Sequence, residues 1–587
     1  MLSKRLLSVP IVLSVLFAIG PARSDGGLQA GFAVRSIVPP AHLMSEVYSV
    51  AGGKNPTKVL DPIEARAVAI SQGGQTLVVI SVDLLGLFYD DVALIRGSIQ
   101  DRYADTQVIV ASSHTHSSID TLGIYGESLV QSGVNDTYQE FVRSQAVDAA
   151  EGALEGLRSA ELTVARREAP AGYNEFDRNR NPGSFDDGVT ALRFTSGGEV
   201  LGTLVNWASH PELIDPDSGS DPQIGRGEVV ISSDYVYSLR QTVELDGGTA
   251  VFVNGPIGAV TALAMPIVDP STGDRFPRRS VAKARHVGEV IGQTARDALA
   301  EDGELVSDPD LSIDSREFEL RVDNQFILAL RAVGTLERQM YLAGVPAPFG
   351  NQVRTQMVRV ELGPIEFLTT PGELQPDLYT GGYLPESEKA NPDVPEERPA
   401  RAQMTGAYRF LIGLGQDELG YFVSATDYTY PSLYPVYSNG EDRNGVDHYQ
   451  ETLSLGRDTA RTLSQITSQM LGIEPEADYF AYPGGFLAAD GSPWYGVPDG
   501  EVAGVWVDTS DSGRFERAED AVAFAKTPSG GEGYGFLDSQ SRDIGPSLGP
   551  SARGVWVDGD GDGSFDARKD PHLFFDTYAL GEGEPRP

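Results

Sequence analysis

Three short, nearly continuous apolar runs constrain the fold of this chain more than any other feature of its sequence. They are TLVVISVDLLGLF at 76–88, TQVIVASS at 106–113 and TAVFVNGPIG at 249–258. A strand with one solvent-facing side alternates apolar and polar residues, whereas a strand covered on both faces is apolar throughout. The runs therefore predict strands in the interior of a sheet whose two faces are both covered.

Segments with the helical spacing of apolar residues alternate with these strands. Helices are predicted at 136–157, 279–300 and 456–471. Two pairs of alternating runs predict hairpins, one around Ser-Gly-Gly at 189–210 and one around Leu-Gly-Pro at 353–374. Strands and helices in this order predict an α/β domain with a mixed sheet.

The N-terminal residues have the pattern of a secretory signal. Lys4 and Arg5 precede an apolar run from Leu6 to Ile19, and small residues follow at 22–24. This run is short for a membrane span and suits a cleaved signal peptide at 1–24, although an uncleaved anchor is the alternative. We therefore expect a bacterial protein that is secreted or periplasmic, without a stable membrane span.

Charge and composition exclude several classes of site and partner. The chain has 84 acidic and 45 basic residues, for a formal net charge of −39. Such a surface repels phosphate backbones, so we expect no nucleic-acid partner, and it attracts divalent cations. There is no cysteine, which excludes disulfides and cysteine metal sites. The oligomeric state is left open.

The character of the sequence changes after about residue 475. Three of the four tryptophans lie beyond this point, and GVWVDTSDSGRFERAED at 504–520 recurs as GVWVDGDGDGSFDARKD at 554–570. An internal repeat of this kind predicts two related structural units. We therefore predict a catalytic domain at 25–475 and a C-terminal two-unit repeat domain at 476–587.

The second repeat contains the beginning of a calcium loop. Positions 1, 3, 5 and 9 of the loop are aspartates, namely Asp558, Asp560, Asp562 and Asp566. Gly563 stands at position 6, where the loop turns sharply, and Ca²⁺ binds six to eight oxygens. Position 12 is Lys569 instead of a bidentate glutamate, so the loop is not a regular EF-hand. Calcium binding is the prediction here, and an unliganded acidic turn is the alternative.

Two of the seven histidines, His114 and His116, lie two residues apart at the end of a predicted strand. In an extended segment such residues face the same side, so both rings can reach one cavity. The pair can provide two zinc ligands, or one ligand and one acid/base group. Two hydrogen-bonded surface histidines in a turn rich in Ser and Thr are the alternative.

His210 and Glu373 are the partners that the strand pattern suggests for this pair. His210 ends the strand-like run GTLVNWASH, and Glu373 follows IEFLTTPG, again at the carboxyl end of a strand. Ligands of open α/β sheets gather beyond the carboxyl ends of the strands. Two histidines and a carboxylate are the ligand set of a catalytic zinc that keeps a position open for water.

The order of these segments resembles the neutral, or alkaline non-lysosomal, ceramidase family. The matching segments, in chain order, are SHTHSS, RNRNPGS, DGVTALRF, NWASH, SSDY, PGE at 371–373, GLGQDELGYFVSATDY at 413–428 and YQETLSLG. They span residues 30 to 470. The resemblance implies an amidohydrolase that cleaves the N-acyl amide bond of ceramide, or of a ceramide-like lipid, with a zinc-activated water.

The resemblance also assigns roles to individual residues. The implied zinc ligands are His114, His210, Glu373 and Tyr421. His116 and Arg180 would then surround the reacting carbonyl, where they stabilise the oxyanion and His116 passes a proton to the leaving amine. Tyr421 rests on the resemblance alone, because nothing in the spacing selects it among 23 tyrosines.

The chain also departs from the family around the expected site. NGPIGAVTA at 254–262 replaces a G-D-V-S-P-N segment, which leaves Thr261 near the position of the family's serine. We predict Asn254, Thr261 and His448 as substrate-binding residues, and a lipid or a small amide as the substrate. A zinc hydrolase of the same fold acting on another amide or ester is one alternative, and an inactive binding protein is the other.

Overall fold

The computed structural model describes residues 27–173 except 129, 175–176, 184–342 except 259 and 264, 345–346, 350–429 except 393, and 449–473. Beyond residue 473 it describes the backbone of seven strands, which lie between residues 484 and 574. Among the described helices, none has both the length and the apolar composition that crossing a membrane requires.

The first sheet has five strands in the order β5-β4-β3-β1-β6. Their bounds are β1 Gln29–Ser36, β3 Glu64–Gln72, β4 Gln75–Val82, β5 Thr106–Ser112 and β6 Arg158–Ser159. β4 and β5 are parallel, and the other neighbours are antiparallel. Helices α1 (Tyr89–Gln100) and α2 (Asp136–Glu155) cover its outer face.

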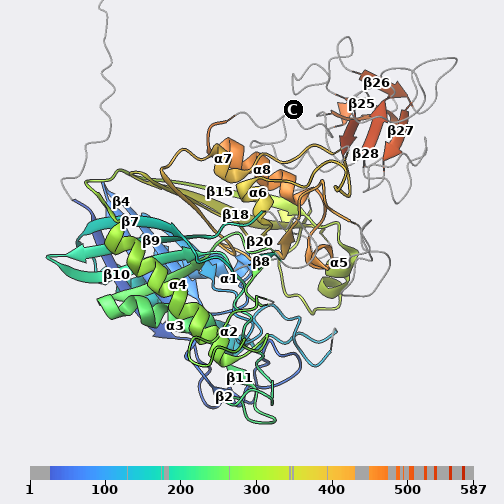
Figure 1. Cartoon of the computed structure of the whole chain (residues 1–587). Coiled ribbons are helices and arrows are strands. Elements are labelled where there is room, and N and C mark those ends of the chain that lie inside the picture. Colours follow the sequence, from blue (N-terminus) through green and yellow to red (C-terminus); the bar gives the residue numbers. More distant parts are fainter. Residues whose placement is uncertain are drawn as a thin grey trace, which may run out of the picture.

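The second sheet also has five strands, in the order β12-β10-β9-β7-β14. Their bounds are β7 Glu161–Glu168, β9 Gly188–Ser196, β10 Glu199–Trp207, β12 Thr249–Asn254 and β14 Glu304–Val306. β10 and β12 are parallel. Helices α3 (Tyr235–Val243), which continues into η1 (Glu244–Asp246), and α4 (Val281–Glu301) cover its outer face (Figure 1).

The third sheet has six strands, with β17-β16-β18-β19-β21 in order and β15 paired to β18. Their bounds are β15 Leu311–Arg321, β16 Tyr341–Leu342, β17 Val345–Pro346, β18 Gln352–Leu362, β19 Ile365–Thr369 and β21 Tyr408–Ile412. Helices α6 (Pro376–Thr380), α7 (Ala400–Gln403) and α8 (Thr459–Met470) pack on it (Figure 1). Side chains of α5 (Gln325–Ala332) contact the same core.

Short strand pairs complete the loops between the three sheets. β2 (Lys58–Val59) pairs with β11 (Val230–Ile231), β8 (Glu175–Phe176) with β13 (Val260–Thr261), and β20 (Glu373–Leu374) with β22 (Tyr421–Phe422). A 3₁₀ turn, η2, spans Gln450–Leu453.

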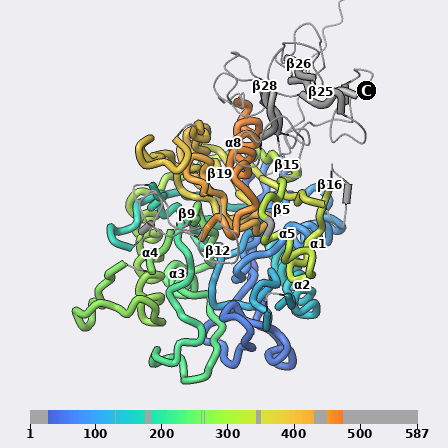
Figure 2. The backbone as a smooth tube through the Cα atoms, turned by 90° about the vertical axis from the view of Figure 1, so that its right-hand side faces the viewer, coloured from blue at the N-terminus to red at the C-terminus, as the bar shows by residue number. Residues whose placement is uncertain are grey.

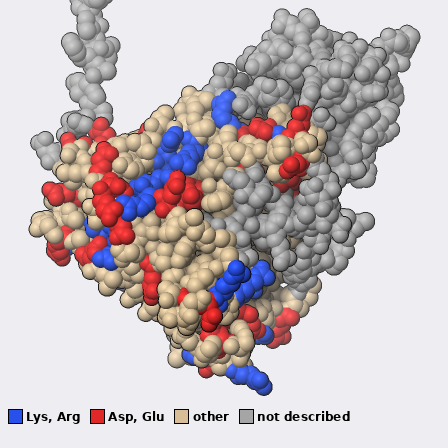
Figure 3. Space-filling model, in the orientation of Figure 1, with Lys and Arg blue, Asp and Glu red and all other residues tan. Residues whose placement is uncertain are grey.

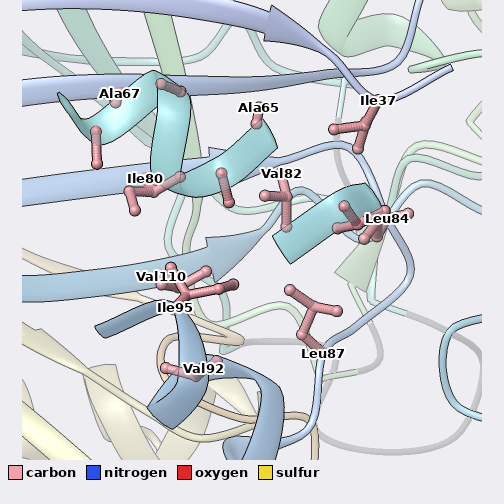
Figure 4. Close-up of a cluster of buried hydrophobic side chains, with 14 of the residues drawn as sticks. Ile37, Ala65, Ala67, Ile80, Val82, Leu84, Leu87, Val92, Ile95 and Val110 are labelled. Carbon is pink, nitrogen blue, oxygen red and sulfur yellow. The ribbon is translucent and has the colours of Figure 1, made fainter. Parts of the chain in front are cut away.

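The three sheets share one central core, and each has a second core beneath its own helices. In β4, Leu77 and Val79 belong to the shared core, whereas Val78 and Ile80 belong to the core beneath the helices. Figure 4 shows part of this second core, with Ile80 and Val82 of β4 and Val92 and Ile95 of α1. Side chains of a strand alternate between its faces, so a strand with two covered faces is apolar at every position. The predicted mixed α/β architecture is therefore confirmed, and this double burial explains the apolar runs.

Most predicted elements agree with the observed ones. The helices predicted at 136–157, 279–300 and 456–471 correspond to α2, α4 and α8, and the two hairpins are β9–β10 and β18–β19. The strand predicted at 76–88 is too long, because β4 ends at Val82. Beyond it, the chain turns so that the carbonyl groups of Leu84 and Leu85 can accept hydrogen bonds from His114.

The described C-terminal strands pair twice in the same register, fifty residues apart. Their bounds are β23 Gly484–Ala488, β24 Pro493–Trp494, β25 Val502–Val507, β26 Ala521–Phe524, β27 Tyr534–Leu537, β28 Gly554–Val557 and β29 His572–Phe574. Phe486 pairs with Val505, as Phe536 pairs with Val555. The strands β23 and β27, which precede the repeated sequence segments, are therefore also part of the repeated strand pairing. The domain limits stay a prediction.

Buried carboxamides join the three sheets to one another. Nδ2 of Asn206, at the end of β10, lies 3.2 Å from the carbonyl oxygen of Val253 and 2.9 Å from that of Leu411 in the third sheet. Oε1 of Gln416, which follows β21, accepts from the N–H of Val110 in β5 at 3.0 Å. Hydrogen bonds are directional, so these amides set the register between the sheets. Contacts between the apolar faces alone would not fix that register.

Replacing Asn206 by aspartate tests this role. The carboxylate would face carbonyl oxygens in a dry interior, so the free energy of unfolding is expected to fall by more than about 3 kcal/mol. Urea denaturation followed by circular dichroism measures the change. The control is Asn135→Asp, because Asn135 caps α2 and aspartate caps equally well. Equal stability of the two variants would contradict the assignment.

Candidate active site

The four residues expected to bind zinc follow strands of all three sheets, two of them directly and two at the start of short strands further along the chain. His114 follows β5 and His210 follows β10, while Glu373 and Tyr421 begin β20 and β22. Figure 2 shows β5, β12 and β19 lying close together in the middle of the molecule. Separate parts of the sequence therefore supply one site, as expected for ligands at the ends of parallel strands.

His114 has an unusual backbone conformation that turns its ring into the site. Its φ angle is 69°, in the left-handed region that few non-glycine residues adopt. Its N–H donates to the carbonyl of Leu84 at 2.9 Å, and Nδ1 lies 2.7 Å from the carbonyl oxygen of Leu85. The ring of His116 is 5.1 Å away between centroids. The two rings converge as predicted, but through this turn and not through an extended strand.

His210 is held in the same way by a single carbonyl group. Both its N–H and its Nδ1 lie 2.9 Å from the carbonyl oxygen of Val260. A carbonyl oxygen only accepts, so Nδ1 of His210 carries the proton, as does Nδ1 of His114. In the neutral rings, Nε2 then has a free lone pair. This is the arrangement in which histidines bind metals.

Glu373 lies between these two Nε2 atoms. Oε2 is 2.8 Å from Nε2 of His210, and Oε1 is 3.5 Å from Nε2 of His114. Two lone pairs and a carboxylate repel one another unless a proton or a cation lies among them. Burial lowers the pKa of His210, but the hydrogen bond and charge of Glu373 outweigh it and raise this pKa to about 9. A zinc ion suits this donor set, because it can take the place of that proton.

Tyr421 lies directly opposite Glu373 in the parallel pair of β20 and β22. Its side chain is buried, and its hydroxyl is 3.4 Å from that of Tyr449. Burial and the charge of Glu373 raise the pKa of Tyr421 well above its ordinary value. The phenol therefore keeps its proton in the metal-free protein, and its position beside the carboxylate is compatible with a further ligand.

His116 contributes an imidazole nitrogen that is free for a ligand or a substrate. Its Nε2 is buried and has no hydrogen-bond partner among the described residues. Burial, and then the charge of His114, lower its pKa to about 3. The ligating atoms of His114, His116 and His210 lie within 4.8 Å of one another, so a three-histidine group is also geometrically possible. Of these three histidines, His114 and His210 turn Nε2 towards Glu373.

Two glutamates near the site escaped the sequence reasoning. Glu212 follows His210 by two residues, and its Oε2 lies 3.1 Å from Nη2 of Arg279. Thr261, predicted to bind substrate, hydrogen-bonds this carboxylate. Burial raises the pKa of Glu212, but the charges of His116 and His210 outweigh it and lower that pKa. The signal in the sequence was the acidic residue placed directly after His210-Pro211.

Glu418 is the second of these glutamates. Its Oε1 accepts from the N–H of Gly420 at 3.0 Å, whereas its Oε2 is buried without a partner in the described structure. Burial, and then the charge of Glu373, raise its pKa well above the ordinary value. No pattern in the sequence distinguished this residue from other glutamates.

Of the other predicted site residues, the structure describes the surroundings of Asn254. Asn254 is fully buried: its Nδ2 donates to the carbonyl of Ser113 at 2.8 Å, and its Oδ1 accepts from the N–H of Ser209 at 3.3 Å. It thus joins the backbone before His114 to the backbone before His210. The remaining predicted residues lie outside the described residues: Arg180, His448, Asp558, Asp560, Asp562 and Asp566.

A buried ion pair supports the turn that holds His114. Asp83 and Arg240 are almost completely buried, and their side chains meet in two bonds of 2.8 and 3.1 Å. Asp83 also accepts from the N–H of Glu64 at 2.9 Å. Because Asp83 directly precedes Leu84 and Leu85, this pair anchors the two carbonyl groups that bind His114.

Arg240→Met leaves Asp83 charged and unpaired in the interior. The free energy of unfolding is expected to fall by about 3–5 kcal/mol, measured by urea denaturation. The matched control is Arg102→Met, which removes a surface pair with Glu151 and should cost less than about 1 kcal/mol. A small effect of Arg240→Met would show that the pair does not anchor the turn.

Comparisons with known proteins identify the fold. No protein-family model and no curated protein sequence matches the chain. A solved structure of neutral ceramidase from Pseudomonas aeruginosa is similar, with a TM-score of 0.54 and 15% identity over 77% of this chain and 76% of that one. A structure of ceramidase complexed with C2 has a TM-score of 0.56 and 14% identity, covering 91% of each chain. At these identities the likeness establishes the fold alone.

Proposed function

We propose that this chain, which has the fold of the neutral ceramidases, is a zinc-dependent amidohydrolase that cleaves the N-acyl amide bond of ceramide or a ceramide-like lipid. One observation carries the proposal: Nε2 of His114 and Nε2 of His210 face the same carboxylate, Glu373, at 3.5 and 2.8 Å. The fold supports the substrate class by analogy, and the donor set supports the metal.

The residues that would hold the zinc are His114, His210, Glu373 and Tyr421. A zinc ion bound there supplies a Lewis acid, which polarises a carbonyl group and lowers the pKa of water to about 7. The backbone carbonyl groups of Leu85 and Val260 keep the two imidazoles in the ligating tautomer. Such supporting hydrogen bonds raise the basicity of the ligands and fix the orientation of the rings.

His116 and Arg180 are proposed to act on the substrate itself. The unpartnered Nε2 of His116 can take a proton from the attacking water and deliver it to the leaving amine. Arg180 is proposed as a donor to the oxyanion that develops at the carbonyl. Glu212, held by Arg279 and Thr261, adds a negative charge near His116 that favours a proton there during transfer.

The sequence also suggests where the protein acts and what else it binds. We propose that residues 1–24 direct export to the periplasm or the medium, and that the C-terminal domain at 476–587 binds calcium in its second unit. On the face that Figure 3 shows, acidic side chains alternate with groups of basic ones, whereas the whole chain has a formal net charge of −39, which suits a protein without a nucleic-acid partner. A zinc hydrolase of another amide or ester, and an inactive binding protein, are the competing functions.

Zinc content and ceramide hydrolysis, measured on the same samples, test the proposal. Wild type is expected to contain one zinc per chain and to cleave a fluorescent short-chain ceramide. His210→Ala and Glu373→Gln should lose most of both. His116→Ala should keep the zinc and lose about 10²–10⁴-fold in rate, because it lacks only the proton-transferring group.

The matched control is His286→Ala, because His286 lies outside the site and hydrogen-bonds Tyr173. It should keep both the zinc and the activity. Zinc without ceramide hydrolysis in wild type would favour another amide or an ester as substrate. Wild type that binds no zinc would contradict the mechanism, and loss of zinc in His116→Ala would indicate a three-histidine site.

The protons released on zinc binding identify the ligands. In the metal-free protein His210 is protonated below pH 9, and Tyr421 is protonated at any neutral pH. Both must lose their protons to bind a metal, so zinc affinity should fall as the pH falls below 9. Calorimetry at pH 7 in buffers of different ionisation enthalpy should count about one proton fewer for Tyr421→Phe. Equal counts would exclude the phenolate as a ligand.

A further inference from the structure

Several buried polar atoms without partners in the described structure belong to residues near the proposed ligands in the sequence. Among the described residues, those close to the four proposed ligands in the chain are Oγ of Ser113, Ser117 and Ser209, Oγ1 of Thr370, Nε2 of His116, Oε2 of Glu418, and both Oε1 and Nε2 of Gln375. Protein interiors leave few such atoms, and each one calls for a ligand, an ion or a water. These positions therefore outline where polar groups of a ligand are expected.

Gln375 differs from the other residues in this group because its whole carboxamide is unpartnered. The side chain is fully buried, and neither Oε1 nor Nε2 has a hydrogen-bond partner within the described part of the chain. Other buried carboxamides, such as those of Asn254 and Gln416, use both their donor and their acceptor. A buried amide with neither bond destabilises the fold, so it calls for a partner, either a buried water or a ligand.

The backbone places Gln375 beside Glu373. Gln375 is extended, with φ −64° and ψ 139°, and its N–H donates to the carbonyl of Phe422 at 3.1 Å. Leu374 packs into the core of the third sheet. Alternation along an extended chain puts the Gln375 side chain on the same side as Glu373, about 6–7 Å further along. The carboxamide is therefore expected to lie beside the proposed metal ligands.

A carboxamide offers one acceptor and one donor group, which matches the chemistry of an amide substrate. Oε1 can accept from the N–H of a secondary amide, and Nε2 can donate to an oxygen of the same substrate. An ester has the carbonyl but no N–H, so it would leave Oε1 buried and unpaired. A site built for a hydrogen bond rejects the analogue that cannot make it.

We infer that Gln375 is a specificity-determining residue, whose Oε1 accepts a hydrogen bond from the N–H of the scissile amide and so makes the site prefer amides to esters. The inference rests on the proposed function, because it takes the substrate to be an acyl amide that reacts beside Glu373. If the inference holds, the Gln375 side chain decides between an amide substrate and the alternative, an ester.

The experiment uses an amide and an ester with the same acyl chain and the same leaving group skeleton. The value of kcat/KM for each is measured with wild type and with Gln375→Met, which keeps the length of the side chain and removes both polar atoms. The amide-to-ester ratio is expected to fall about tenfold in the variant, the effect of one hydrogen bond. The difference in reactivity between the two substrates cancels in this comparison.

Zinc content and Tm are measured on the same samples as structural readouts. Gln375→Met should keep its zinc, and its Tm should not fall, because two unpartnered atoms are removed. The control is Gln139→Met on α2, on the outer face of the first sheet, where the Nε2 bond to Asp91 of α1 is lost. Its Tm should fall, and its amide-to-ester ratio should equal that of wild type.

The outcomes separate the inference from the proposed function. An unchanged ratio in Gln375→Met, with wild type active on the amide, overturns the inference and leaves the amidohydrolase intact. A lower Tm with an unchanged ratio assigns Gln375 to the fold through a buried water, which also overturns it. Wild type that cleaves only the ester, or neither substrate, refutes the proposed function and the inference with it.

Discussion

The hydrogen bonds of three buried carboxamides are the interaction on which the rest of this structure depends. Asn206, Asn254 and Gln416 join backbone groups of different sheets where their strands end. Apolar faces attract one another without fixing a register, because the hydrophobic effect has no direction. Directional amide bonds supply that register. Through the bonds of Asn254 to Ser113 and Ser209, the alignment of the sheets becomes the alignment of His114 with His210.

The site concentrates features that a stable interior would avoid. His114 is held in a left-handed conformation, Glu373 faces two histidine nitrogens, and Glu418 keeps an unpartnered oxygen within the described structure. Each of these costs stability, so each must be imposed by its surroundings. The Asp83–Arg240 pair and the carbonyl group of Val260 are such surroundings. Local strain and unsatisfied groups gather where a protein binds and reacts, and here they gather around four strand ends.

The electrostatics of the site agree with those of the whole chain. Glu212 and Glu418 are additional carboxyl groups around Glu373, and Arg279 is the cation paired with Glu212. The negative charge of Glu212, whose pKa is lowered, favours a divalent cation, and it favours a protonated amine more than a neutral or anionic leaving group. Glu418, whose pKa burial and the charge of Glu373 raise well above the ordinary value, adds a protonated carboxyl group instead.

The sequence by itself determined the double burial of the strands, the mixed α/β architecture, and the candidacy of His114, His210 and Glu373, because strand periodicity and strand ends are local patterns. Tyr421 came from resemblance alone, and its place opposite Glu373 is a pairing between distant segments. Only the tertiary structure decided the turn at His114, the structural contacts of Asn254 and the unpartnered amide of Gln375. Each of these depends on which backbone groups meet across sheets, and no local pattern encodes that choice.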